Sequence, residues 1–320
     1  MTGHFASDPF AANPESAPVD RLIHIADLHF WRVTLNPFRL LNKRLLGNIN
    51  VWLRRRHQFA MAASRVHAQA VAAQGVSTVL LTGDFTSTAL EEEFAMAGEF
   101  MRQLQALKLN AIVLPGNHDV YTFESVRGRR FERHMERYLP REGYPTVVEL
   151  GGGTPLLLVP TVCPNVLSSR GRIRDREIEC VRELLQQGAG PILVAGHYPV
   201  LTETPGYILT KQRNLRNAEA LREALGEAGR PILYVAGHVH RFSYVQDERH
   251  PHLHHLTTGA FFYRNKRENI EGEFAEIAVH PNCFEVVRHV LRGSWEQIRA
   301  EAGHPPNRRV SGCSREQHPP

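Results

Sequence analysis

Histidine, aspartate and asparagine recur in five short motifs, each placed directly after an apolar run. In AGHVHRF (236–242), His238 and His240 are two residues apart, and such residues of a strand point to the same side. The other four motifs contribute Asp27 and His29 in IADLHF, Asp84 in LTGDF, Asn117 and His118 in LPGNHDV, and His197 in VAGHYP. Each motif alone is weak evidence for a binding site, because D-x-H, GD and GH occur by chance. The five in this order indicate one shared site.

These side chains offer nitrogen and oxygen donors and no thiolate. Such a donor set suits manganese, iron, zinc, nickel or cobalt without selecting one of them. The candidates are too many for one ion and enough for two, and a single carboxylate can bridge two ions. A pair of ions can hold a phosphoryl group and lower the pKa of a bound water, which supplies a hydroxide nucleophile at neutral pH. The motifs therefore favour a two-ion centre that can activate a water molecule and hold a phosphoryl group.

The elements that must position these residues are strands and helices in alternation. Apolar runs predict strands, and amphipathic runs predict helices between them. The expected strands cover 21–27, 77–84, 110–119, 154–161, 190–197 and 230–240, the helices 65–75, 90–107, 174–187 and 217–229, and a terminal hairpin 274–291 turns at Pro281-Asn282. In open α/β sheets, binding sites form beyond the carboxyl ends of the strands, so five strands would deliver their ligands to one edge.

The motif set D-x-H, GD, GNHD, GH and GHxH, over roughly residues 20–292, resembles the calcineurin-like metallophosphoesterase family. The "GHVH" ending looks most like its bacterial cyclic-nucleotide phosphodiesterase branch. The resemblance implies an α/β fold in which two mixed β-sheets pack as a sandwich flanked by helices. It also implies a dinuclear, metal-dependent phosphoric ester hydrolase, with manganese, iron or zinc as the expected ions and a metal-bridging hydroxide as the nucleophile.

Carried over by motif, the resemblance assigns a role to each candidate residue. Asp27, His29 and His240 would hold one ion, Asn117, His197 and His238 the other, and Asp84 would bridge both. His118 would be the acid that protonates the leaving oxygen. Asp119 is either a support for the ligands or a plain turn residue. Many relatives have an acidic residue three places after the bridging aspartate, where this chain has Ser87, so the partner that orients His118 is left open.

Composition limits the remaining questions. The chain has 320 residues, 42% of them hydrophobic, with a net charge of +5, which suggests an anionic partner without naming it. Its four cysteines show no paired spacing, so we expect neither a thiolate metal site nor a disulfide framework, and a cytoplasmic location. We expect a single domain over 20–302 between disordered tails at 1–19 and 303–320. The amino-terminal segment lacks the pattern of a secretory signal, and no apolar run suffices for a membrane span.

The substrate is the open question. A basic amphipathic insertion at about 36–58 is either a helix packed on the domain, a flap beside the site or a surface that meets anionic lipid. Arg241 and Arg127 are weak candidates for binding substrate, and the stretch around Arg127 is equally compatible with a solvated helix face. A small phosphodiester or phosphomonoester is the first expectation. The alternatives are a lipid-linked diphosphate cleaved at the inner membrane surface, a nucleic acid (disfavoured because no aromatic-interleaved basic stripe occurs), and a non-catalytic scaffold.

Overall fold

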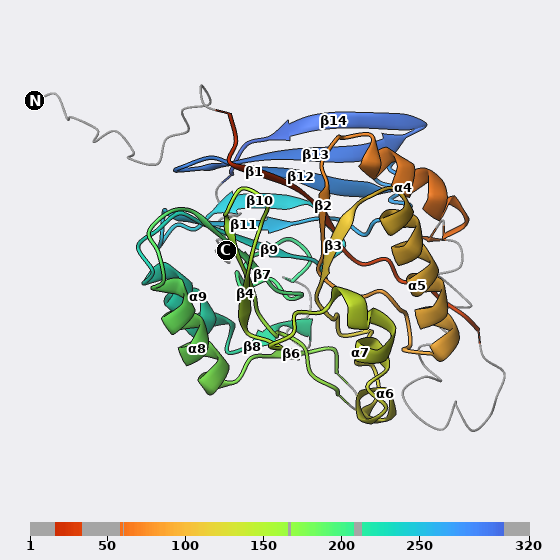
Figure 1. Cartoon of the computed structure of the whole chain (residues 1–320), viewed down its shortest axis with the longest axis horizontal. Coiled ribbons are helices and arrows are strands. Elements are labelled where there is room, and N and C mark those ends of the chain that lie inside the picture. The colour runs from red at the N-terminus through yellow and green to blue at the C-terminus, as the bar shows by residue number, and fades with distance from the viewer. Residues whose placement is uncertain (1–16, 34–57, 60, 166–167, 208–212, 304–320) are drawn as a thin grey trace, which may run out of the picture.

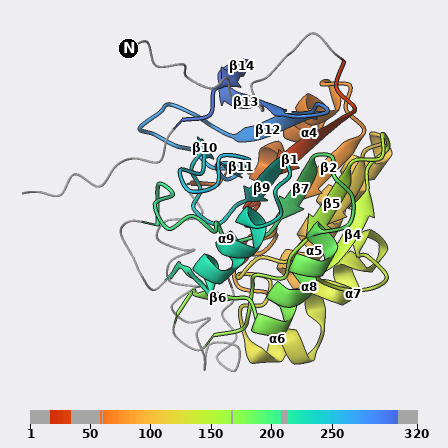
Figure 2. The same ribbon diagram turned by 90° about the vertical axis from the view of Figure 1, so that its left-hand side faces the viewer.

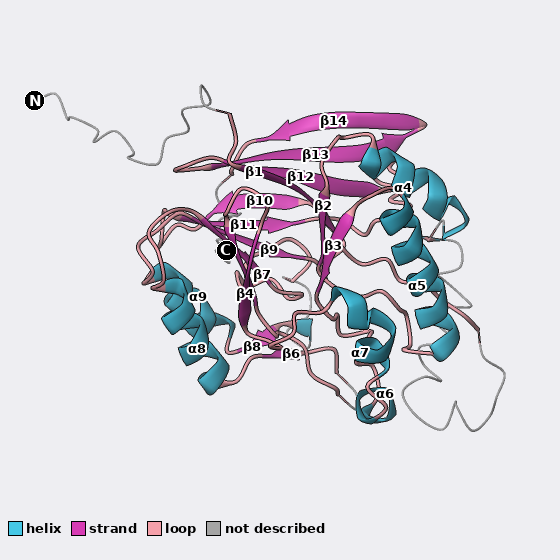
Figure 3. Ribbon diagram, viewed as in Figure 1, coloured by secondary structure: helices cyan, strands magenta, loops and turns pink. Residues whose placement is uncertain are grey.

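Two six-stranded mixed sheets lie face to face, and helices cover both outer faces (Figures 1 and 3). This computed structural model describes residues 17–33, 58–59, 61–165, 168–207 and 213–303. The architecture confirms the helix-flanked sandwich of two mixed sheets that the family resemblance implies. The 90° view of Figure 2 shows the layers from the side of α8 and α9.

The first sheet has the strand order β14-β13-β12-β1-β2-β3. Strands β1, β2 and β3 run parallel to one another, whereas β12, β13 and β14 add to the other edge as antiparallel neighbours. The bounds of these strands are β1 Asp20–Ile25, β2 Thr78–Leu81, β3 Asn110–Val113, β12 Glu273–Val279, β13 Phe284–Arg292 and β14 Ser294–Ala300.

The second sheet has the order β10-β11-β9-β7-β5-β4, with β11, β9, β7 and β5 parallel and both edge strands antiparallel. Its strands are β4 Thr146–Glu149, β5 Pro155–Leu158, β7 Ile192–Ala195, β9 Ile232–Ala236, β10 Ser243–Gln246 and β11 Leu253–Thr257. All residues of β7 and β9 are buried, as expected for parallel strands covered on both faces. A two-stranded pair, β6 Gly171–Arg172 and β8 Leu215–Arg216, lies apart from both sheets.

Three apolar cores hold the layers together. The central core lies between the sheets and includes Leu80 and Leu158, both fully buried. The outer face of the first sheet packs against α4 and α5, and the outer face of the second against α8 and α9. The helices and short 3-10 turns are η2 Met61–Ala63, α4 Ser64–Ala72, α5 Glu91–Ala106, α6 Phe123–Arg127, α7 Arg130–Met135, η3 Glu136–Tyr138, α8 Asp175–Leu185 and α9 Ala218–Gly226.

The strands and helices expected from the sequence are present, and the terminal hairpin is β12–β13, whose turn contains Pro281 and Asn282. The sequence analysis did not predict strands β4, β10, β11 and β14. These strands are short or lie at sheet edges, and their alternation of buried and exposed residues is weak; in β14 no residue is buried. They complete the two sheets without carrying candidate ligands.

Some expectations fall outside the described residues. The predicted tails at 1–19 and 303–320 and the insertion at 36–58 lie there almost entirely. Within the described part of the chain, no helix combines the length and apolarity needed to cross a membrane. Cys163, Cys180 and Cys283, the cysteines that the structure describes, form no disulfide.

Candidate metal centre

The site lies where the carboxyl ends of parallel strands from both sheets meet. Loops after β1, β2 and β3 of the first sheet and after β7 and β9 of the second carry the candidate ligands. Backbone hydrogen bonds join these loops directly. The Asp27 amide donates to the Gly83 carbonyl at 3.1 Å, the His29 amide to the Asp84 carbonyl at 2.8 Å, and the Gly237 amide to the His197 carbonyl at 3.1 Å.

Two of the glycines that precede candidate ligands are required by the close approach of these loops. Gly83 has φ +99°, and a Cβ there would overlap the backbone of Gly116. A Cβ on Gly237 would come within 2.7 Å of the Ala26 Cβ and 2.9 Å of Asp27 Oδ2. Because only glycine fits such contacts, the loops can bring their ligands together at this edge.

Six of the histidine and aspartate candidates fall into two groups that share Asp84. One group is Asp27, His29, Asp84 and His240, and the other is Asp84, His197 and His238; within each, the ligand atoms lie within 4.8 Å of one another. Asp84 Oδ2 is 3.6 Å from His29 Nε2, and Asp84 Oδ1 is 3.5 Å from His197 Nε2. One carboxylate thus faces both groups, with a different oxygen toward each.

Asn117 completes the second group. Its Oδ1 atom lies 3.0 Å from His197 Nε2 and 2.9 Å from His238 Nδ1. The structure therefore brings together all seven candidate ligands, in the two sets that the resemblance implies.

Backbone carbonyls fix the orientation of three of the histidines. His29 Nδ1 faces the Thr86 carbonyl at 3.3 Å, His197 Nδ1 the Thr82 carbonyl at 2.8 Å, and His238 Nε2 the Arg213 carbonyl at 3.0 Å. A carbonyl can only accept, so each of these ring nitrogens carries the proton. The opposite nitrogen of each ring then presents a lone pair to the centre, as in metal-bound histidines.

Burial keeps the His197 and His238 rings neutral. It lowers the pKa of His197 to about 4 and that of His238 well below 6.5, with the neighbouring histidines adding to the effect on His238. A neutral ring has a single N–H, which is already directed at a carbonyl. Consequently the Asn117 oxygen faces one nitrogen lone pair on His197 and one on His238. Acceptors that converge in this way fit cations between them.

The backbone shows strain at the same residues. Ten non-glycine residues of the described chain have positive φ, and five of them are the candidate ligands Asp27, His29, Asp84, His238 and His240. Each such conformation costs about 1 kcal/mol or more and persists where the surroundings hold it, commonly at functional sites. The strained residues coincide with the residues that the motifs single out.

His118 lies beside the first group, with its ring edge-on to the His29 ring at a centroid distance of 4.9 Å. Its backbone amide donates to Asp84 Oδ1 at 2.7 Å, and its Nδ1 lies 2.6 Å from the Ser87 carbonyl oxygen. That carbonyl is the orienting partner that the sequence left open. Many relatives have an acidic side chain at the position of Ser87. In this chain the backbone carbonyl of Ser87 faces His118.

Asp119 links the loops that carry Asp84 and Asn117. Its carboxylate accepts hydrogen bonds from the amides of Gly116, Phe85 and Thr86 at 2.8, 3.2 and 2.9 Å. Burial, and after it the negative charge of Asp84, raises the pKa of Asp119 above its usual 3.8. The sequence left Asp119 either as a support for the ligands or as a plain turn residue. These contacts match the first interpretation.

Phe59 and Tyr263 were not singled out from the sequence. The Phe59 ring packs edge-on against His29 at 5.2 Å and lies 5.5 Å from the Tyr263 ring, which in turn is 6.1 Å from His240. Phe59 directly follows the insertion in the sequence, and its ring lies at the centre. Single aromatic residues carry no motif, and only the fold reveals their place.

The two weak substrate candidates lie in different places. Arg241 is exposed and lines a hollow together with His240. Arg127 is exposed at the end of α6 and lines another hollow that contains none of the candidate ligands. Arg130, close to Arg127, forms ion pairs with Glu91 and Glu124.

Comparisons with known proteins agree with this geometry. The family model of the calcineurin-like phosphoesterases matches residues 20–242. No curated protein sequence matches the chain significantly. Similar solved structures include a dimetal phosphatase from Danio rerio (14% identity, TM-score 0.59, covering 89% of this chain and 100% of that one). Another is a purple acid phosphatase from yellow lupin, Lupinus luteus (11% identity, TM-score 0.56, covering 87% and 52%).

At these identities the structural neighbours show a shared fold, and the family match carries the assignment. It spans well over half of the chain and includes all seven candidate ligands. The chain therefore belongs to the calcineurin-like phosphoesterase family and is a metal-dependent phosphoric ester hydrolase.

Proposed function

We propose that the protein hydrolyses a small phosphodiester or phosphomonoester at a dinuclear centre, with Asp84 shared between the two ions. The observation that carries the proposal is the position of Asp84, whose two oxygens face His29 and His197 at 3.6 and 3.5 Å. Asp27, His29 and His240 would hold one ion, and Asn117, His197 and His238 the other. When bound, the ions would polarise the phosphoryl oxygens and lower the pKa of a water molecule.

The chain's own residues contribute orientation and a proton. The Thr82, Thr86 and Arg213 carbonyls hold their histidines so that the ligand nitrogens point inward. His118 is half-buried, and with its Nδ1 directed at the Ser87 carbonyl, Nε2 is the nitrogen through which it exchanges a proton. In the proposal, the protonated His118 ring gives its Nε2 proton to the leaving oxygen and keeps the Nδ1 proton on the Ser87 carbonyl, a role that histidine can fill near neutral pH.

Hydrolysis of bis-p-nitrophenyl phosphate and p-nitrophenyl phosphate with added Mn²⁺ tests the proposal. Wild-type protein is expected to turn over at least one of them, and Asp84→Ala and Asn117→Ala to abolish turnover. Glu248→Gln, which neutralises an exposed carboxylate outside both groups, serves as the matched control and should keep full activity. Turnover that persists in Asp84→Ala would contradict the proposal.

A lipid-linked diphosphate is a second candidate substrate, and the path of the chain favours it. Gln58, the last residue of the insertion at 36–58, lines the hollow beside His240, and the next residue, Phe59, packs against His29. The insertion contains three consecutive arginines, Arg54, Arg55 and Arg56. A basic, partly apolar segment that ends at the site suits an anionic lipid headgroup.

Pelleting with phosphatidylglycerol vesicles tests this candidate. The full chain is expected to co-sediment, and the variant Arg54→Gln, Arg55→Gln, Arg56→Gln to remain in the supernatant. Vesicles of phosphatidylcholine alone are the control. Equal sedimentation of both proteins with anionic vesicles would rule out this role for the three arginines.

A further inference from the structure

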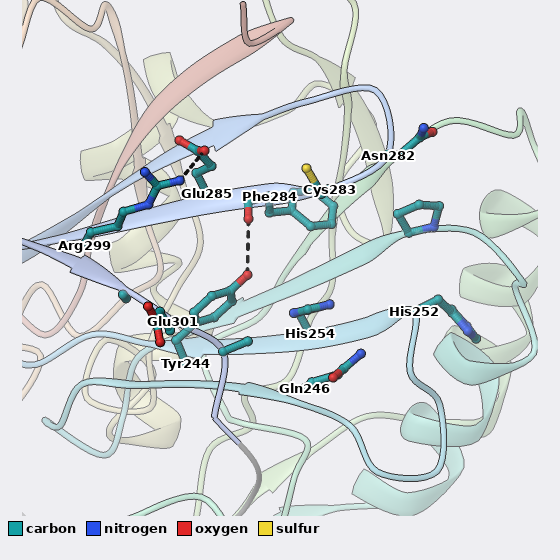
Figure 4. A pocket seen from close by; sticks show the side chains of 13 residues that line it. Tyr244, Gln246, His252, His254, Asn282, Cys283, Phe284, Glu285, Arg299 and Glu301 are labelled. Atoms are coloured by element: carbon teal, nitrogen blue, oxygen red, sulfur yellow. Dashed lines mark hydrogen bonds and ion pairs between the residues drawn. The ribbon is translucent and has the colours of Figure 1, made fainter. Parts of the chain in front are cut away.

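Three surface hollows among the described residues are candidates for binding a part of the substrate remote from the ions. The hollow in Figure 4, of about 420 Å³, lies between β10–β11 and β13–β14. It contains none of the candidate ligands, and its Arg299 is paired with Glu285 at 2.7 Å. The hollow lined by Arg127 and Arg129 also lacks them. Only the third of these hollows reaches the metal centre.

This third hollow, of about 840 Å³, is lined by His240 and by the segment 263–268 that follows β11. His240 is part of the first ligand group, and its side chain is 28% exposed, whereas Asp27 of the same group is fully buried. His240 therefore forms a boundary shared by the hollow and the centre. A substrate whose scissile phosphate lies at the centre would extend from it past His240.

The lining of the hollow is strongly basic. Arg241, Arg264, Lys266 and Arg267 all line it and are exposed. Arg241, Lys266 and Arg267 form no ion pair with other described residues, and Arg264 has only Glu271 at 3.9 Å. Four cations beside one hollow repel one another unless an anion is present, and a phosphate group would relieve that repulsion.

The one acidic residue of the lining is already engaged. Glu268 lies 2.9 Å from Arg288 and accepts a hydrogen bond from Asn265 at 2.9 Å. Its charge is thus directed toward Arg288 on β13. The net charge of the residues that line the hollow therefore remains positive by several units.

We propose that this hollow binds a second phosphate of the substrate, and that Arg241, Lys266 and Arg267 determine a preference for compounds with a diphosphate or a second phosphate group. The inference rests on the proposed function, because the scissile phosphate must lie at the metal centre. Tyr263, between His240 and the basic segment, would contact the portion of the substrate that joins the two phosphates.

The test compares two kinds of probe on the triple variant Arg241→Ala, Lys266→Ala, Arg267→Ala. In the metal-free full chain, calorimetry with methylenediphosphonate should show binding at least tenfold weaker for the variant than for wild type. In the Mn²⁺-loaded protein, kcat/KM for bis-p-nitrophenyl phosphate, which has a single phosphate, should fall by a smaller factor than the affinity for methylenediphosphonate. An equivalent loss for both probes, or none for methylenediphosphonate, would overturn the inference.

A matched control removes three charges elsewhere. Arg65, Arg137 and Arg176 are exposed residues of α4, η3 and α8 that do not line the hollow, and their triple alanine variant should bind methylenediphosphonate like wild type. If the control variant binds methylenediphosphonate as weakly as the first variant does, the loss of affinity comes from the change in net charge, and the inference is overturned. If wild type binds methylenediphosphonate as expected but hydrolyses neither nitrophenyl ester, the proposed function fails while the anion site stands.

The vesicle experiment distinguishes the sources of the second phosphate. Binding of methylenediphosphonate in solution tests the hollow itself. Sedimentation with anionic vesicles that is unchanged in the Arg241, Lys266 and Arg267 variant would assign the membrane contact to the insertion alone. Reduced sedimentation of this variant would place a lipid phosphate in the hollow.

Discussion

His118 Nδ1 lies 2.6 Å from the backbone carbonyl oxygen of Ser87, and this contact sets the orientation of the candidate acid. The carbonyl accepts from Nδ1–H, so the neutral ring has its proton on Nδ1. When the protonated ring gives up its Nε2 proton, this same neutral tautomer remains. The contact uses the main chain of a residue that follows the shared ligand Asp84 by three positions. The acid and the shared ligand are therefore positioned by the same loop.

His118→Asn should affect substrates according to their leaving groups. For an alkyl or unsubstituted phenyl ester, whose leaving oxygen needs a proton, we expect kcat to fall about 10²–10⁴-fold. For p-nitrophenyl esters, whose leaving group departs unprotonated, the loss should be less than about tenfold. Steady-state kinetics across a series of aryl esters checks this, with metal content as the control. A loss independent of the leaving group would remove His118 from the acid role.

Ser87→Ala should leave the rate within about threefold of wild type, because the main-chain carbonyl that accepts from His118 is retained. The side chain of Ser87 donates only to the His29 carbonyl at 3.2 Å. The informative measurement is kcat against pH. An unchanged profile supports the main-chain partner, and a displaced profile would show that the hydroxyl tunes His118.

Asp119→Asn should weaken metal binding about 10–100-fold, since residues that support ligands typically have effects of this size. An asparagine retains one acceptor oxygen and directs an NH2 group at backbone amides that themselves donate. Titration with Mn²⁺ followed by calorimetry measures the change. Asp175→Asn, the same substitution at an exposed aspartate, should bind like wild type. Unaltered affinity in Asp119→Asn would leave Asp119 as a plain turn residue.

Asp247→Asn should lower the free energy of unfolding by about 3–5 kcal/mol, because it leaves Arg222 buried without its carboxylate partner. Arg222 Nε and Nη2 lie 2.7 and 2.8 Å from the two Asp247 oxygens. Glu248→Gln, at the neighbouring exposed residue, is the control, and urea unfolding is the measurement.

The same ion pair predicts a pH dependence. Burial opposes ionisation of Asp247, but hydrogen bonds from His255 and Arg222 prevail and hold its pKa well below 3.8. Because the pKa is lower in the folded state than in the unfolded state, the stabilisation is fully present above about pH 4 and is lost as the pH falls further. Wild type and Asp247→Asn should therefore approach each other in stability in acid. A constant difference down to pH 2 would contradict this explanation.

The sequence predicted much of the fold and the composition of the site for a clear reason. Apolar runs that end in Gly-Asp, Gly-Asn or Gly-His give both the strands and the residues at their ends, and parallel strands bring those ends together. The features it missed depend on contacts between distant segments. The Ser87 carbonyl cannot be recognised in a sequence because every residue has one, and Phe59 reaches His29 only through the fold.

The basic hollow was only half anticipated. Arg241 was suspected because it follows His240, whereas Arg264, Lys266 and Arg267 are 23 or more positions further along the chain and reach the hollow because the segment after β11 lies beside the centre. The sequence RNKR at 264–267 is a visible cluster of positive charges that could have indicated an anion-binding segment. Arg127 was suspected from its place after GNHD, but it lines a separate hollow that contains none of the candidate ligands.

Metal content tests the central claim most directly. Wild-type protein dialysed against Mn²⁺ and then freed of excess ion should retain two ions per chain in elemental analysis, and Asp84→Ala should lose both or nearly both, because both ligand groups include Asp84. Asp84→Ala that retains two ions, or a wild-type protein that binds none, would contradict the dinuclear centre.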